Sequence, residues 1–286
     1  MKKHIVSIIL ILIFVIGVSL LLYPSVANWW NTKVFNEEIA YYTSAVATVD
    51  NTQLDEILDA ARLYNQEHVS RGNSFVSLKD EALEEYNAQL SLDGNSMMGY
   101  LHIPKINSSL PIYHTTDESV LASGIGHIEG TSLPVGGESS HCVLSGHRGL
   151  PAARLFTDLD QIVVGDTFVM EIFGLTLTYE VDQILTVLPQ ELSQLQIEEG
   201  QDYCTLVTCT PYGVNSHRML VRGHRIANAS GELRITADAL QIRPIVVAPF
   251  VAIPILIILF VMMLVDTGNK KRISYPEEGG KTNEIK

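Results

Sequence analysis

The chain has 286 residues, a formal net charge of −13 and a pI near 5.1. A chain this acidic repels the negatively charged phosphate backbone of nucleic acids, so its composition argues against a nucleic-acid partner. Three cysteines are too few for a disulfide scaffold. No C-x-x-C motif or close Cys/His ligand pair occurs, so no metal site is expected.

The first predicted element is a membrane anchor over residues 5–23. Residues 5–22 are almost wholly apolar and follow Met1, Lys2 and Lys3. This length lies between a signal-peptide core and a membrane helix, and Ser25-Val26-Ala27 offers one candidate cleavage site. Both interpretations stay open, and we favour an uncleaved anchor with residues 1–4 in the cytoplasm.

Residues 24–98 are predicted to be a helical stalk that ends in a lid region. The stretch from residue 34 to about 90 is polar, with apolar residues at near-helical spacing over 54–64 and 78–90. Two helices could pack against the following domain or lift it from the membrane.

Residues 99–228 are predicted to form a mainly β domain. Short apolar runs alternate there with Gly, Pro and Asn, and many short strands with few helices indicate a closed or nearly closed barrel. The eight expected strands cover residues 100–103, 110–113, 126–128, 142–145, 167–172, 175–188, 203–209 and 218–226. Short helices are expected at residues 152–159 and 189–195.

His147 is a candidate general acid and base. It follows the short apolar run 142–144 and Ser145-Gly146, so it lies where a strand gives way to a loop. Histidine exchanges protons near neutral pH. Eight other histidines occur in the chain, and an isolated one is more often a surface or core residue.

Cys209 is a candidate nucleophile. It ends a β-branched run, Pro211, Tyr212 and Gly213 break that run, and Arg218 opens the next strand. A thiol beside a fixed positive charge favours the thiolate, which is the reactive form. The alternative is a small core cysteine and a surface arginine.

The other two cysteines are predicted to be buried free thiols. Side chains alternate between the faces of a strand, so Cys204 should face away from Cys209 and Cys142 away from His147. If the two strands are near each other, Cys142 and Cys204 approach on the face opposite the site.

The C-terminal region is predicted to be a linker (229–243), a second membrane helix (244–266) and a basic cytoplasmic tail (267–286). Residues 245–265 are long and apolar enough to span a bilayer, and Lys270-Lys271-Arg272 follows. Basic residues flank the outer end of each span, so both termini are expected in the cytoplasm and the body outside it.

Two motifs together resemble the sortases, the cysteine transpeptidases of Gram-positive cell surfaces. They are L-S-G-H-R-G-L around His147 and T-L-V-T-C-T-P-Y-G-x-N-x-x-R from Thr205 to Arg218, with the arginine nine positions after the cysteine. The resemblance covers roughly residues 99–226. C-T-P-Y-G-V-N, G-H-R-G-L-P and two membrane segments are similar to class C, the pilus-assembling branch.

The resemblance implies an eight-stranded sortase β-barrel without cofactor and a catalytic trio of Cys209, His147 and Arg218. Its implied substrates are pilins or surface proteins with a C-terminal L-P-x-T-G-like signal, and Thr208 and Asn215 are candidate substrate contacts. The acceptor is a pilin lysine in a pilus-building enzyme, or a cell-wall precursor in an anchoring enzyme. An inactive membrane-tethered scaffold is the alternative of another class. The sequence leaves the oligomeric state open.

Class C sortases usually carry a lid with an Asp-Pro-aromatic motif before the barrel. Asp93 matches the lid aspartate, but Gly94 and Asn95 stand where proline and the aromatic residue are expected. Glycine is flexible and asparagine cannot fill an apolar groove. The sequence therefore predicts a degenerate lid and an open site.

Overall fold

The computed structural model describes residues 2–71, 75, 78–92, 96–151 and 153–228. The chain divides into two units, and the first 25 residues belong to one of them. They form the start of helix α1 (Lys2–Thr48), where apolar side chains such as Leu12 and Ile13 are more than half exposed. Within the described residues, α1 is the one helix long and apolar enough to cross a membrane. The predicted second span lies outside the described residues.

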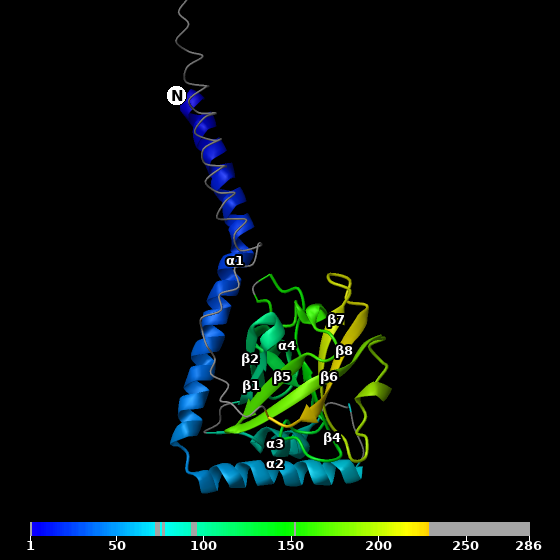
Figure 1. The fold of residues 1–286 in the computed structure, drawn as a ribbon. Helices are drawn as coiled ribbons and strands as arrows, with labels where there is room; N and C mark the ends of the chain where they lie inside the picture. The colour runs from blue at the N-terminus through cyan, green and yellow to red at the C-terminus, as the bar shows by residue number, and fades with distance from the viewer. Residues whose placement is uncertain (1, 72–74, 76–77, 93–95, 152, 229–286) are drawn as a thin grey trace, which may run out of the picture. The chain divides into compact units, whose positions relative to one another are not determined.

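The second unit, Val26–Glu232, begins with a helical layer (Figure 1). It contains the rest of α1, then α2 (Asn51–Arg71) and α3 (Asp80–Ala88). Along α1, Phe35, Ile39, Tyr42 and Val46 recur at helical spacing and are all buried. Their spacing gives this part of α1 an apolar stripe against the barrel, so the helices pack on the domain.

Buried polar contacts fix the helical layer to the barrel. The Tyr42 hydroxyl donates to the carbonyl of Met98 at 3.0 Å and accepts from the amide of Phe173 at 2.8 Å. The Asn65 side chain binds both the carbonyl (3.1 Å) and the amide (2.7 Å) of Leu133. Buried backbone groups need such partners, so these two side chains hold α1 and α2 in one place.

Tyr86 fixes α3 to the barrel through a buried polar contact. Its side chain is wholly buried, and its hydroxyl lies 2.8 Å from Nδ1 of His127. Nε2 of His127 lies 2.8 Å from the carbonyl oxygen of Ser132, which can only accept. The proton therefore sits on Nε2, and Nδ1 accepts from Tyr86. Burial raises the pKa of the Tyr86 hydroxyl, which keeps it a donor.

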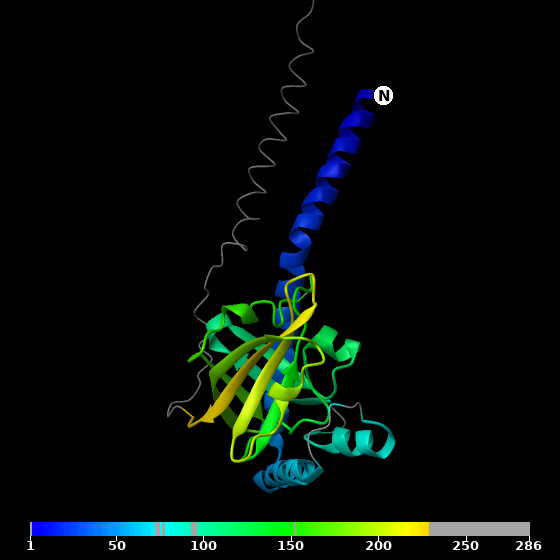
Figure 2. The same cartoon turned by 90° about the vertical axis from the view of Figure 1, so that its right-hand side faces the viewer.

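Eight strands close into a barrel in the order β1-β2-β3-β4-β7-β8-β6-β5. Figure 2 shows the strands of the barrel from a second side. They are β1 (Met97–Ile103), β2 (Ser108–Tyr113), β3 (Ile125–His127), β4 (Ser140–Ser145), β5 (Thr167–Ile172), β6 (Leu175–Val187), β7 (Asp202–Thr210) and β8 (His217–Ile226). Most neighbours pair antiparallel, but β2 pairs with β3 and β4 with β7 in parallel. The predicted eight-stranded barrel is confirmed.

The helices between the strands differ from the prediction. Residues 155–158, expected to be helical, form turns that lead into a 3-10 helix, η2 (Leu159–Gln161). The expected helix at 189–195 is reduced to η3 (Ser193–Leu195). Two further elements, η1 (Pro104–Ile106) and α4 (Glu118–Ser123), were not predicted. All four are six residues or shorter, and pieces this short carry little periodic signal.

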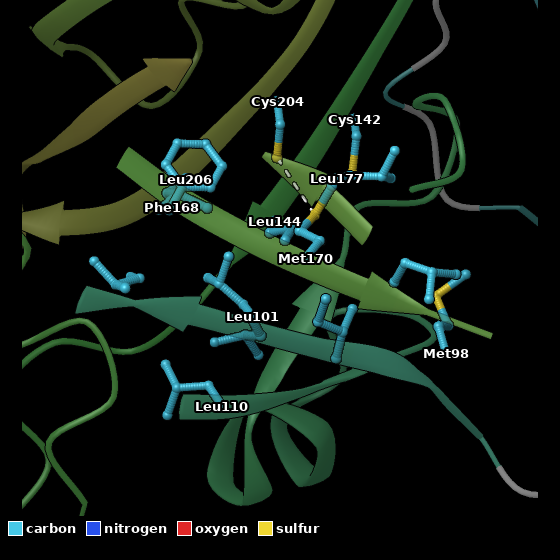
Figure 3. Packing of buried hydrophobic residues seen from close by; sticks show 14 of the residues in the cluster. Met98, Leu101, Leu110, Cys142, Leu144, Phe168, Met170, Leu177, Cys204 and Leu206 are labelled. Atoms are coloured by element: carbon cyan, nitrogen blue, oxygen red, sulfur yellow. Dashed lines mark hydrogen bonds between the residues drawn. The ribbon is translucent and has the colours of Figure 1, made fainter. Parts of the chain in front are cut away.

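The barrel interior is apolar and contains two of the three cysteines (Figure 3). Cys142 on β4 and Cys204 on β7 are paired in register, buried and free. The Cys204 sulfur lies 3.8 Å from the Met170 sulfur. Burial, and then the neighbouring Cys142 thiol, raises the pKa of Cys204, so it stays protonated. The predicted buried free thiols are confirmed.

Candidate active site

Two of the three predicted catalytic residues lie on the adjacent strands β7 and β8, and the third lies in the loop that follows β4. β7 lies between β4 and β8 in the barrel. Cys209 is the penultimate residue of β7 and is directly opposite Arg218 on β8 in their antiparallel pairing. Directly opposed residues present their side chains to the same face with Cβ atoms roughly 5 Å apart. The thiol and the guanidinium are therefore cross-strand neighbours.

His147 reaches the same level from the parallel neighbour β4. The last registered pair of β4 and β7 is Ser145 with Val207, two residues before His147 and Cys209 respectively. The contact continues beyond β4, since the Gly146 amide donates to the Val207 carbonyl at 3.1 Å. The Thr208 hydroxyl then donates to the Gly146 carbonyl at 2.8 Å. His147 thus begins the loop beside the end of β7.

The site lies on the outer face of the barrel. Val143, Val207 and Leu220 form a small cluster with Leu195, separate from the interior core. Alternation along each strand places His147 on the face of Val143, Cys209 on that of Val207 and Arg218 on that of Leu220. All three site residues are half-buried. The interior residues support the strands, and the outer face leaves the thiol open to a substrate.

Arg218 carries the uncompensated charge of this face. Among the described residues it forms no ion pair, and its Nη1 donates to the carbonyls of Asn215 (3.2 Å) and His217 (3.1 Å). Arg222 lies four residues further along β8, on the same face, and is instead paired with Asp182 at 3.0 Å and with Glu198 at 3.5 Å. A guanidinium without a carboxylate partner stabilises negative charge that develops beside it, such as that on the oxygen of a tetrahedral intermediate.

Arg148 joins the histidine loop to the cysteine strand, a role that sequence reasoning missed. Its Nη1 donates to the Thr210 hydroxyl at 3.4 Å, and its Nη2 forms an ion pair with Asp160 of η2. The side chain is 10% exposed, and among the described residues its Nε has no hydrogen-bond partner. Arg148 follows His147 and Thr210 follows Cys209, so this contact sets the spacing of the two catalytic candidates.

A second contact joins the same two loops. Gly149 has φ +81°, and a Cβ atom there would lie 2.7 Å from the ring of Tyr212. Glycine adopts this left-handed conformation without strain, and it lets the ring approach the backbone. Tyr212 belongs to the β7–β8 loop and is 61% exposed. The only sequence signal for either contact is adjacency to His147 and Cys209.

The remaining predicted site residues have different surroundings. Thr208 is buried, and its hydroxyl is engaged with Gly146, which favours a positioning role. Asn215 is exposed in the β7–β8 loop with φ +58°, and its backbone carbonyl accepts a hydrogen bond from the Arg218 side chain. Asp93 lies outside the described residues. On either side of its segment, the Gln89 and Ser96 carbonyls lie 2.7 Å and 2.9 Å from the ring nitrogens of His114. No group that could hold a metal ion occurs among the described residues.

Comparison with known families gives one match. The Sortase domain model matches residues 101–226, which contain the outer-face site. Sortase D of Bacillus subtilis is 28% identical over 182 residues, which cover 62% of this chain and 86% of that protein.

Solved structures give closer relatives. Sortase C1 of Streptococcus agalactiae has 52% sequence identity and a TM-score of 0.65, over 67% of this chain and 99% of that one. Sortase C of Streptococcus pneumoniae, described in terms of pilin substrate specificity, has 41% identity and a TM-score of 0.61. That match covers 67% of this chain and 97% of the other.

Proposed function

Because the chain belongs to the sortase family of cysteine transpeptidases, with class C structural neighbours, we propose that it joins pilin subunits through Cys209, His147 and Arg218. The observation that carries the proposal is the shared outer face of β4, β7 and β8. It gathers a thiol, an imidazole and an uncompensated guanidinium at the ends of three neighbouring strands.

In the first half-reaction, the Cys209 thiolate attacks the carbonyl carbon of threonine in an L-P-x-T-G-like signal. The tetrahedral intermediate carries negative charge on the former carbonyl oxygen, and Arg218 stabilises it. Collapse breaks the Thr–Gly C–N bond, and His147 gives a proton to the departing amine. A thioacyl enzyme remains on Cys209. Removing a donor to such an oxyanion typically costs on the order of 100-fold or more in rate.

In the second half-reaction, an amine attacks the thioacyl carbon and loses a proton to His147. The Cys209 thiolate leaves, and a new amide bond joins acyl group and amine. We propose a pilin lysine as this amine, because class C neighbours include a sortase described by its pilin specificity. The amine of a cell-wall precursor is the alternative acceptor.

The chain is further proposed to be a membrane protein with a body outside the cytoplasm and both termini inside. The long apolar helix α1 supports the first span. The degenerate lid around Asp93 remains a prediction, and rapid alkylation of Cys209 that Asp93→Ala leaves unchanged would support it.

Intact-mass measurement tests the proposed first half-reaction. The enzyme is mixed with an L-P-x-T-G peptide, and we expect an adduct that maps to Cys209, disappears on mild hydroxylamine and is absent from Cys209→Ala. A Cys209→Ala variant that retains full biological function would instead favour the inactive scaffold.

The acceptor is tested with purified pilin. A ladder of covalent oligomers that Cys209→Ala abolishes supports polymerisation. Pilin that stays monomeric, although the thioacyl enzyme forms and a cell-wall precursor amine resolves it, would refute the polymerase proposal in favour of anchoring.

A further inference from the structure

Helix α1 contacts the barrel at several points along its length. The contact nearest its N-terminus is with the loop that follows β4 and carries His147. Oδ1 of Asn28 accepts a hydrogen bond from the Arg154 amide at 3.1 Å. This loop returns to the site, because the Phe156 amide donates to the His147 carbonyl at 3.1 Å. Tyr42, which contacts the start of β1, lies 14 residues further along α1, or about 21 Å of helix. The catalytic end of the barrel is therefore the end that α1 meets first.

Chain length limits how far this end can lie from the apolar segment. The apolar run ends at Leu22, and six residues lead from there to Asn28. Six residues span about 9 Å as helix and at most about 21 Å when fully extended. The limit depends on covalent connection alone. If residues 5–23 cross the membrane, the loop that carries His147 is held within this distance of the bilayer's apolar core.

The residues next to Asn28 have the chemistry of a membrane interface. Trp29 and Trp30 are the two tryptophans of the chain and are 62% and 57% exposed. The Lys33 ammonium lies 6.0 Å from the Trp30 ring centre. Exposed tryptophans beside an apolar helix are typical of the headgroup region, where one side of the ring is apolar and the N–H is hydrated.

The β7–β8 loop adds apolar surface at the same end of the barrel. Cys209 and Arg218 flank this loop, and its side chains Tyr212 and Val214 are 61% and 69% exposed. Tyr212 also contacts Gly149 of the histidine loop. In Figure 1 this loop and α2 lie at opposite ends of the barrel unit.

We propose that the catalytic end of the barrel rests on the outer lipid surface, with Trp29 and Trp30 in the headgroup region and Tyr212 and Val214 against it. The proposal rests on the proposed function and on α1 as a membrane anchor. It adds a substrate requirement, because the site can then reach only a scissile bond that is presented close to the membrane surface. A bond presented far above the membrane is out of reach.

Depth-dependent fluorescence quenching tests this placement without any activity. The full chain is reconstituted in phosphatidylcholine vesicles with brominated acyl chains. Intrinsic tryptophan fluorescence then reports on Trp29 and Trp30 alone, and we expect strong quenching. In a Cys209→Ala background, a fluorophore on Val214→Cys should be quenched by a headgroup-bound quencher, and one on Asp59→Cys of α2 should not. Equal quenching of the two labels would overturn the proposal.

A spacer tests the consequence for catalysis. Seven helix-forming residues inserted between Ser25 and Val26 lengthen the connection by about 10 Å and nearly preserve the helical phase. The same insert between Lys3 and His4 is the matched control. We expect processing of an L-P-x-T-G peptide fused to a transmembrane helix in the same vesicles to fall by about tenfold or more. The soluble peptide should react at the unaltered rate.

The outcomes separate this proposal from the proposed function. Unchanged rates on the anchored substrate, or equal losses on both substrates, would overturn the membrane placement. An unaltered chain that forms no thioacyl adduct with either substrate would instead refute the proposed function, and the quenching experiment would still decide the placement.

Discussion

Replacing Arg148 by methionine should slow catalysis much more than it destabilises the fold. Methionine keeps an unbranched apolar stem but removes the links to Thr210 and Asp160. The lost ion pair has a partner that is 49% exposed, so it contributes about 0–1 kcal/mol. The Thr210 hydrogen bond is long, at 3.4 Å. The buried Nε, which has no hydrogen-bond partner among the described residues, costs about 1–3 kcal/mol, and the substitution removes that cost.

The lost ion pair and hydrogen bond are nearly offset by removal of the unsatisfied Nε, so the free energy of unfolding should change by about 1 kcal/mol or less. For a domain of this size that shifts Tm by about 2–4 °C. Catalysis has no such compensation, because the Arg148 contact sets the position of His147 relative to Cys209. A misplacement of about 1 Å costs on the order of 100-fold in rate. We expect the acylation rate to fall by about 10–100-fold with little change in KM.

The assay combines stopped-flow acylation by an L-P-x-T-G peptide with thermal unfolding. Arg154→Met is the matched control, since Arg154 lies on the same loop and its side chain pairs instead with Asp158 of that loop, at 2.6 Å. Arg148→Lys should recover part of the rate, because an ammonium can still pair with Asp160. An Arg148→Met enzyme that acylates within twofold of the unaltered rate would refute the positioning role.

Three further predictions concern the loops and the buried polar groups. Gly149→Ala should lower the free energy of unfolding by about 1 kcal/mol or more in thermal unfolding, because φ +81° strains alanine and its Cβ displaces the Tyr212 ring. If the substitution costs nothing in a Tyr212→Ala background, the clash with the ring is the whole cause and backbone strain contributes nothing. Tyr86→Phe should lower the free energy of urea unfolding by about 1–3 kcal/mol, since His127 loses its buried partner; an unchanged midpoint would contradict that account. Burial lowers the pKa of His141 below its ordinary 6.5. The unfolded chain therefore binds the proton more readily, stability should fall as pH drops through about 6.5, and His141→Gln should flatten this slope in unfolding curves from pH 7.5 to 5.

The strands were predictable because local patterns specify them. Alternating or continuous apolar runs between Gly, Pro and Asn marked all eight, with errors of a few residues at the ends. The parity of the strand also placed Cys204 and Cys209 on opposite faces. In the structure, Cys204 is wholly buried in the interior and Cys209 is half-buried at the outer site.

The contacts that align the site were not predictable in the same way. Arg148 and Thr210 are 62 positions apart, and they meet because β4 and β7 pair in parallel with one particular register. No periodicity within either segment reports that register. The same holds for Asn28 and Arg154, which are 126 positions apart. Sequence patterns identify which residues have reactive groups, and the barrel's closure decides which of their neighbours hold them in position.

The two faces of β7 explain how the proposed nucleophile and a stable barrel core share one strand. On the inner face, Cys204 and Leu206 are wholly buried, and Thr208 uses its hydroxyl to hold the Gly146 carbonyl. On the outer face, Cys209 stands beside Arg218, whose positive charge has no carboxylate partner among the described residues because its hydrogen bonds go to neutral carbonyls. Arg222 shows the opposite arrangement on the same strand as Arg218, since Asp182 and Glu198 neutralise it. A carboxylate placed beside Arg218 would therefore compensate its positive charge without disturbing the core.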